Sequence, residues 1–221
     1  MFSQSVSMQP AQTNRVLANA FKVLTAMMGT TALASFVSMA LGAGSGVSLV
    51  CSLLGLGLIL ALSFGYQKMS STTALGLVFL FSLLEGFGLG GLLNRVLATS
   101  HGSPALFYAS TLTAAATATC YMVAKSSKAN FSRMGSFLFA GLIILLLASI
   151  LAIFFPSPIF VMVLSAMGAL IFTGYLLMDM QAVIRGEQTD YIWAALSIYI
   201  DIMGLFKNLL SLFNIIGSSD D

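Results

Sequence analysis

Apolar residues dominate seven long segments of this 221-residue chain, and short polar stretches separate them. Each segment is close to the roughly 20 residues that an α-helix needs to cross the hydrocarbon core of a bilayer. We therefore predict an all-α fold, a bundle of seven transmembrane helices that forms one domain over residues 1–221. The predicted spans are Val23–Leu41, Val47–Tyr66, Thr73–Leu93, Pro104–Ala124, Gly135–Phe155, Ile159–Met180 and Tyr191–Ile215.

The connections between the spans are short, and two of them contain residues that end helices. Gly42–Gly46 is rich in glycine and serine, and Pro156-Ser157-Pro158 cannot continue a helix. Because short connections join antiparallel neighbours, successive spans are expected to lie side by side in alternating directions. A polar N-terminal segment, residues 1–22, is expected to precede the first span.

Composition and charge support a membrane protein. The chain is 58% hydrophobic and 7% charged, whereas a soluble domain is about 25% charged. A net charge of +2 does not suggest a nucleic-acid partner, so the expected surroundings are the lipid bilayer. Basic residues are concentrated on the side that is cytoplasmic if the N-terminus is inside, and only Arg95 lies in an opposite loop. The basic residues on the cytoplasmic side are Arg15, Lys22, Lys68, Lys125, Lys128, Arg133 and Arg185.

Asp179 and Asp201 each lie inside an apolar segment long enough to span a bilayer. A carboxylate in hydrocarbon is costly, so a chain keeps one there only with a partner or a function. Both spans place small or polar residues on one helical face, which we expect to look into the bundle. These faces comprise Ser165, Gly168, Phe172, Tyr175 and Asp179 in the sixth span, and Ser197, Asp201, Gly204, Asn208 and Ser211 in the last.

Helical geometry places the two aspartates near each other without fixing their contact. Asp179 lies roughly 9 Å and Asp201 roughly 16 Å from the loop at residues 185–190, so a modest helix shift brings them together. Two adjacent carboxyls share a proton, and losing it creates repulsion and a site for a hard cation such as Ca²⁺. The alternative is that each aspartate accepts hydrogen bonds separately and ties helices together.

Three further charges within or at the ends of spans have two interpretations each. Lys68 either forms a charge latch with Asp179 or extends to the lipid headgroups. Glu85, midway along the third span, is either functional or a structural tie, and Lys207 in the last span either repels cations or extends outward. The chain contains no activated nucleophile, nucleotide-binding loop or HExxH motif, so we predict a protein that is not an enzyme and needs no cofactor.

The last fifty residues resemble the signature of the Bax inhibitor-1 family of membrane proteins. The matching stretches are Gly174-Tyr-Leu-Leu-Met-Asp179-Met-Gln181 and Ala195-Leu-Ser-Ile-Tyr199-Ile-Asp201-Ile-Met-Gly-Leu-Phe206, and Glu85-Gly86 also fits. The resemblance implies a seven-helix bundle with its last helix near the centre that acts as a pH-sensitive Ca²⁺ leak channel. It further implies that Asp179 and Asp201 are a proton-sharing sensor and that Lys68 occupies the latch position. Lysine in place of arginine there weakens the latch, because it lacks the planar bidentate contact.

Short loops and a single compact bundle suggest a bacterial inner-membrane protein, and the resemblance implies a second class of function in such cells. In that alternative, the protein transports nothing and regulates a membrane-anchored quality-control protease through protein contacts. The two functions differ in their dependence on the carboxylates. A leak channel should lose its pH control when Asp179 or Asp201 becomes Asn, whereas a regulator should depend on the polar N-terminal segment instead.

Overall fold

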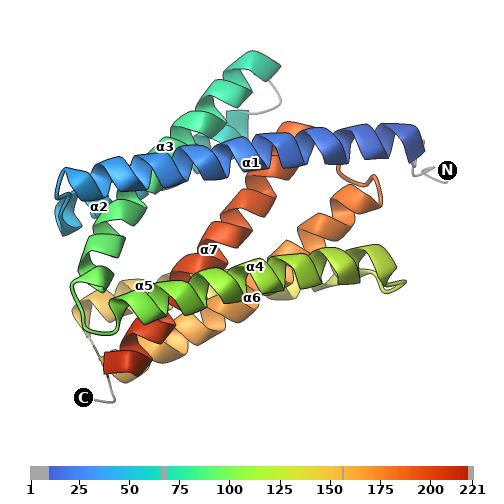
Figure 1. Cartoon of the computed structure of the whole chain (residues 1–221). Coiled ribbons are helices and arrows are strands. Elements are labelled where there is room, and N and C mark those ends of the chain that lie inside the picture. Colours follow the sequence, from blue (N-terminus) through green and yellow to red (C-terminus); the bar gives the residue numbers. More distant parts are fainter. Residues whose placement is uncertain (1–9, 66–68, 156, 219–221) are drawn as a thin grey trace.

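All the regular secondary structure in the described part of the chain is helical. A computed structural model describes residues 10–65, 69–155 and 157–218, and Figure 1 shows the arrangement. Seven α-helices in this part are long and apolar enough to cross a membrane, which confirms the predicted all-α, seven-span class. They are α1 (Pro10–Ala40), α2 (Ser45–Gly65), α3 (Ser71–Leu97), α4 (Gly102–Ser126), α5 (Gly135–Phe154), α6 (Pro158–Ile184) and α7 (Tyr191–Ser218), with a short 3-10 helix, η2 (Phe131–Met134), before α5.

Several helices extend beyond the apolar spans that the sequence indicates. Helix α1 begins at Pro10, so much of the polar segment 1–22 belongs to the first helix, and α6 continues to Ile184 rather than ending at Met180. Hydropathy detects the part of a helix that lies in hydrocarbon, whereas the backbone remains helical until its terminal groups find other partners. At 31 residues, α1 is about 46 Å long by its rise per residue and exceeds the hydrocarbon thickness.

The hairpin between α6 and α7 has a defined geometry at both helix ends. Gly186 follows α6 with a φ of 73°, a left-handed conformation that glycine adopts without a Cβ clash. Asp190 caps α7, because its Oδ1 accepts hydrogen bonds from the backbone N–H groups of Ile192 (2.8 Å) and Trp193 (3.1 Å). These two ends fix the register in which α6 and α7 pack.

Helix α7 lies at the centre of the bundle, as predicted. It packs against α1, α3, α4 and α6, whereas α2 packs mainly on α3 and α5 mainly on α6. Figure 1 shows α7 running obliquely between α1 and the layer formed by α4 and α6. Its buried side chains include Tyr199, Asp201 and Leu210, whereas the other residues of its polar face, Ser197, Gly204, Asn208 and Ser211, are half-buried.

A buried hydroxyl network ties the central helix to α1 and α3. The Tyr199 hydroxyl lies 2.5 Å from Thr31 Oγ1, and Thr31 Oγ1 donates to the backbone carbonyl of Ser82 at 3.0 Å. Because the single Thr31 proton is used on Ser82, Tyr199 is the donor to Thr31. Phe81 packs edge-to-face on Tyr199 with ring centroids 5.8 Å apart. The network satisfies polar groups that lipid could not.

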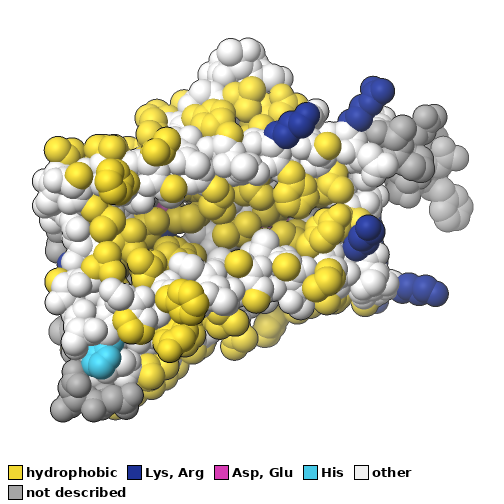
Figure 2. All heavy atoms as spheres, in the orientation of Figure 1, with side chains coloured by type: hydrophobic (Ala, Val, Ile, Leu, Met, Phe, Trp, Pro, Cys, Tyr) yellow, Lys and Arg dark blue, Asp and Glu magenta, His cyan; other side chains and the backbone are white. Residues whose placement is uncertain are grey.

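The outer surface of the bundle is apolar, as expected for contact with lipid. Large hydrophobic side chains are exposed on the outer helices, among them Phe64 on α2 and Phe137 on α5. Figure 2 shows one such face, with most of its visible basic side chains at the end where α1 begins and α4 ends. The bundle therefore has an apolar belt and one end that is richer in positive charge.

Candidate functional site

Helices α6 and α7 pack in an antiparallel register along their small and polar faces. Side chains meet at intervals of three or four residues, and glycine on one helix makes room for a larger residue on the other. A Cβ on Gly168 would overlap the Asn208 side chain, and one on Gly204 would overlap the Phe172 ring. The facing pairs are Ser165 with Ser211, whose hydroxyls hydrogen-bond at 3.0 Å, Gly168 with Asn208, and Phe172 with Gly204.

The same register determines how the two aspartates face each other. Continuing it toward the hairpin places Tyr175 level with Asp201, and Asp179 level with Ser197. Asp179 and Ser197 line a cavity of about 60 Å³ next to Trp193, and the Ser197 hydroxyl donates to the backbone carbonyl of Ala194 at 3.3 Å. Asp179 and Asp201 thus lie on facing helices, offset by one helical turn and within electrostatic range of each other.

The environments of the two carboxyl groups differ. Asp201 is only 5% exposed, and its Oδ2 has no hydrogen-bond partner among the residues that the structure describes. Asp179 is half-buried and borders the small cavity near the hairpin, and Tyr175 lies within electrostatic range of both carboxyls. A buried acceptor that makes no hydrogen bond is costly, so Asp201 Oδ2 is the atom of this site best placed to take a proton or a cation.

Glu85 and Lys207 form an ion pair between α3 and α7. Lys207 Nζ donates to Glu85 Oε2, and the two side chains are 32% and 12% exposed, respectively. The Glu85 carboxyl lies beside Gly55 of α2, and a Cβ on that glycine would be in ordinary contact with it at 3.6 Å. The sequence predicted no partner for either charge. The structure shows that Lys207 neutralises Glu85 inside the bundle instead of extending to the headgroups.

A cavity with a mixed polar and apolar lining continues from the ion pair toward the other end of the bundle. It has a volume of about 350 Å³ and is lined by Ser48, Leu49 and Ser52 of α2, by Gly88, Leu89, Leu92 and Arg95 of α3, and by Lys207. Polar groups are therefore arranged in sequence along the bundle, from Asp179 and Asp201 to the ion pair and then to Arg95. Cationic residues occupy two positions in the second half of this arrangement.

Residues at the end of α6 hold the loop between α4 and α5. Gln181 Oε1 accepts a hydrogen bond from Phe131 N (2.8 Å), and its Nε2 donates to Ala129 O (3.0 Å). Arg185 Nη2 donates to the same carbonyl at 2.7 Å, so its strongest contact is with this loop rather than with a carboxylate of the site. The proposed latch residue Lys68 lies outside the described residues.

Two structural features of the site were absent from the sequence-based predictions. The ion pair joins residues that are 122 positions apart, and the Thr31–Tyr199 contact joins residues 168 apart. Single intramembrane charges signalled that Glu85 and Lys207 needed partners, but no local pattern indicates which ones. Tyr199 lies within the recognised signature, yet its partner on the first helix has no sequence signal of its own.

The fold and this site define a polytopic seven-helix membrane protein with ionisable side chains buried inside the bundle. The family described as inhibitor of apoptosis-promoting Bax1 matches residues 13–219, and the chain belongs to this Bax inhibitor-1 family. It is 34% identical to an uncharacterized membrane protein of Vibrio cholerae over 100% of this chain and 98% of that one. It is also 34% identical to the Golgi anti-apoptotic protein of vaccinia virus strain Lister, over 78% of this chain and 70% of the viral protein.

A plant protein shares a shorter stretch with the chain. Protein LIFEGUARD 4 of Arabidopsis thaliana is 43% identical over 38% of this chain and 35% of its own length. Bacterial, viral and plant relatives therefore share sequence with this chain, and the family model covers all seven helices except the first residues of α1.

Proposed function

We propose that the protein is a pH-sensitive cation leak channel that carries Ca²⁺, gated by Asp179 and Asp201. The observation that supports this most is the buried Oδ2 of Asp201, which lacks a partner within the described structure and lies on the helix facing Asp179. A purely structural aspartate in a membrane would be expected to satisfy both of its oxygens. The offset of one turn leaves the two carboxyls separate in this arrangement.

The proposed gate depends on the proton count of the pair. Sharing one proton lets the carboxyls approach, whereas two ionised carboxylates repel each other. A sliding or tilting of α7 against α6 by up to one turn, about 5.4 Å, would change their separation. Because Arg185 is engaged with the α4–α5 loop, no described cation beside Asp179 compensates the second charge. We therefore expect cation flux to rise as pH rises through the titration of the pair.

Ca²⁺ would be a transient occupant of such a pathway rather than a resident ion. Ca²⁺ in a stable site takes six to eight oxygen ligands, and the described residues include no cluster of three or more Asp, Glu, His or Cys side chains. Two carboxylates with neighbouring hydroxyls would attract the ion but hold it weakly. Conduction requires binding that is favourable enough for the ion to enter the site and weak enough for it to leave.

The test is Ca²⁺ flux into proteoliposomes between about pH 6 and 8, a range in which strongly perturbed carboxyls titrate. We expect wild-type flux to increase with pH and both Asp179→Asn and Asp201→Asn to flatten the profile. Asn208→Asp serves as a matched control, because it adds a carboxyl to the same face of α7 without removing the pair. Flux that rises as pH falls would instead indicate a latch on Asp179 that protonation releases, and an unchanged profile in both Asn variants would refute the gate.

We also propose that the protein resides in a bacterial inner membrane with its N-terminus in the cytoplasm. The basis is the concentration of basic side chains at the end of the bundle where α1 begins, visible on the face in Figure 2. Cysteines placed singly at residue 128, in the loop after α4, and at residue 100, in the loop before it, would test this. A membrane-impermeant thiol reagent added to intact spheroplasts should label position 100 and leave position 128 unlabelled.

Regulation of a membrane-anchored quality-control protease is the second candidate function. The supporting observation is that the first two turns of α1 include exposed polar residues such as Gln12, Asn14 and Arg15 at one end of the bundle. This surface offers a contact site that does not involve the carboxylates. If removing residues 1–14 changes protease activity in a co-reconstituted membrane while Asp201→Asn does not, the regulator is favoured over the channel.

A further inference from the structure

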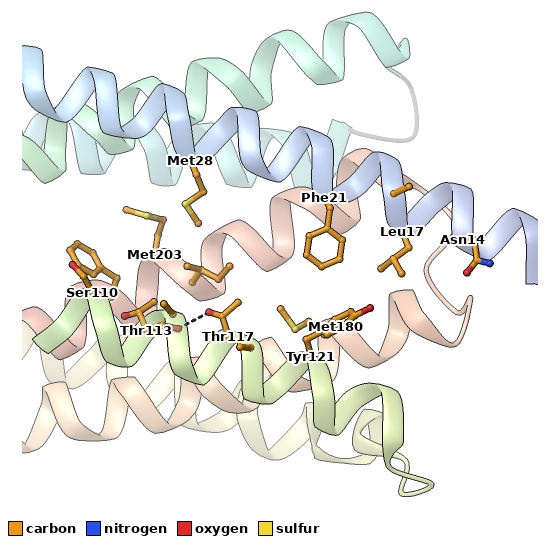
Figure 3. Close-up of a pocket in the computed structure, with 15 residues that line it drawn as sticks. Asn14, Leu17, Phe21, Met28, Ser110, Thr113, Thr117, Tyr121, Met180 and Met203 are labelled. Carbon is orange, nitrogen blue, oxygen red and sulfur yellow. Dashed lines mark hydrogen bonds between the residues drawn. The ribbon is translucent and has the colours of Figure 1, made fainter. Parts of the chain in front are cut away.

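An apolar groove separates α1 from α4 on one face of the bundle. Figure 2 shows it as a hollow lined with hydrophobic side chains, and its volume is about 870 Å³. Helices α1 and α4 form its walls and pack mainly on the central helices, and the rings of Phe21 and Tyr121 meet across it. In Figure 3, Phe21 and Met28 point into it from α1, and Thr117 and Tyr121 from α4. The volume is within the range of protein pockets that enclose a bound small molecule.

The position of the groove in the bundle restricts what fills it. Along α1 the groove runs from Asn14, near the N-terminus of the helix, to Met28, near its middle. Along α4 it runs from Tyr121, near the C-terminus of the helix, to Ser110, in its first half. Both walls are membrane-spanning helices, so the space opens toward the hydrocarbon and not toward bulk water. Its lining is almost entirely apolar, which favours an acyl chain over a hydrated ion or a polar metabolite.

Basic side chains beside the groove favour a particular lipid head. Lys125 lies one helical turn beyond the lining residue Tyr121 on α4, and Lys22 directly follows the lining residue Phe21 on α1, although neither lysine lines the groove itself. Both lysines are exposed, and no Asp or Glu lines the groove. Basic side chains that flank a gap between transmembrane helices on the cytoplasmic side bind anionic lipid heads.

We propose that this groove is a binding site for an anionic phospholipid of the inner leaflet. One acyl chain lies between α1 and α4, and the phosphate group lies between Lys22 and Lys125. The floor of the groove includes Met180 and Ile202, the residues that directly follow Asp179 and Asp201. A bound lipid would therefore touch the helix segments that carry both carboxyls, although its binding does not depend on their function.

Quenching by brominated lipids tests the site directly. The reporter is Tyr121→Trp in a Trp193→Phe background, and a matched reporter, Phe139→Trp, lies on the lipid-exposed face of α5. We expect brominated phosphatidylglycerol to quench the groove reporter at a lower mole fraction than brominated phosphatidylcholine. Each basic residue near the membrane surface raises the affinity for an anionic lipid by about fivefold, so the two lysines should give a clear preference for phosphatidylglycerol over phosphatidylcholine. Phe139→Trp should show none.

Charge variants decide whether the lysines cause the preference. Lys22→Gln combined with Lys125→Gln should abolish it, whereas Lys128→Gln with Arg133→Gln removes the same charge from the same end and should leave it intact. A preference that survives the first pair, or that is equal at Phe139→Trp, overturns the proposal. If Tyr121→Trp does not fold, Phe21→Trp reports on the same groove from the opposite wall, since the two rings pack with centroids 6.1 Å apart.

Discussion

Lys207 of α7 donates to Glu85 of α3, which places an ion pair inside a helix bundle whose outer surface faces lipid. The pair joins the central helix α7 to α3. Because α2 packs mainly on α3, the pair also links α2 to the centre of the bundle. A single charge of either sign at this depth would be costly, whereas the pair neutralises itself within the protein. The contact also sets a cationic group beside the cavity that Arg95 lines.

Removing one member of this pair should cost more stability than removing both. We expect Lys207→Met to lower the free energy of unfolding by about 2–3 kcal/mol, less than for a fully buried pair because Lys207 is partly exposed. Adding Glu85→Gln should restore most of the loss, since no uncompensated charge remains. Reversible unfolding in mixed detergent micelles measures both values. Strictly additive costs would show that the two charges do not interact.

Gly168 should tolerate no side chain, in contrast to a glycine that faces open space. Gly168→Ala forces the new methyl group against Asn208 and should destabilise the protein by about 1–3 kcal/mol. Gly29→Ala on α1 meets no neighbouring atom within 4 Å, so it should stabilise the helix by up to about 1 kcal/mol. The midpoint of thermal unfolding in detergent should therefore move in opposite directions for the two variants. Equal shifts would contradict the close α6–α7 packing.

Tyr199→Phe should remove one buried hydrogen bond while keeping the aromatic contact with Phe81. The expected cost is about 1 kcal/mol, because Thr31 still donates to the Ser82 carbonyl after the change. Tyr108→Phe, at a ring that is 55% exposed on α4, should have no measurable effect. A double-mutant cycle of Tyr199→Phe with Thr31→Val isolates the pair. A coupling energy near zero would show that the two hydroxyls contribute independently.

Gln181→Leu should loosen the loop between α4 and α5 without unfolding the bundle. The change removes the side-chain contacts to Phe131 N and Ala129 O, so local opening of residues 127–134 becomes easier. Limited proteolysis with trypsin, which cuts after Lys128 and Arg133, should become several-fold faster. The control, Gln188→Leu, alters a different loop and should leave the rate at these sites unchanged. Equal acceleration by both variants would point to a global loss of stability.

The sequence alone determined the number and order of the helices and the faces that look inward. Spacing along the chain was sufficient for this, because runs of about 20 apolar residues and intervals of three or four residues are local patterns. Asp179 and Asp201 could be identified for the same reason, since a carboxylate in an apolar run is conspicuous without any knowledge of its neighbours. The resemblance carried by residues 174–206 supplied the family.

Only the tertiary structure decided which distant groups meet. The α6–α7 register sets Asp179 opposite Ser197 and places the two aspartates one turn apart, a relation that depends on how the hairpin closes and how Gly168 and Gly204 fit their partners. The Glu85–Lys207 pair, the Thr31–Tyr199 hydroxyls and the groove between α1 and α4 likewise join separate helices. Helix periodicity gives the direction of a side chain around its own axis, but the packing of whole helices determines what that side chain contacts.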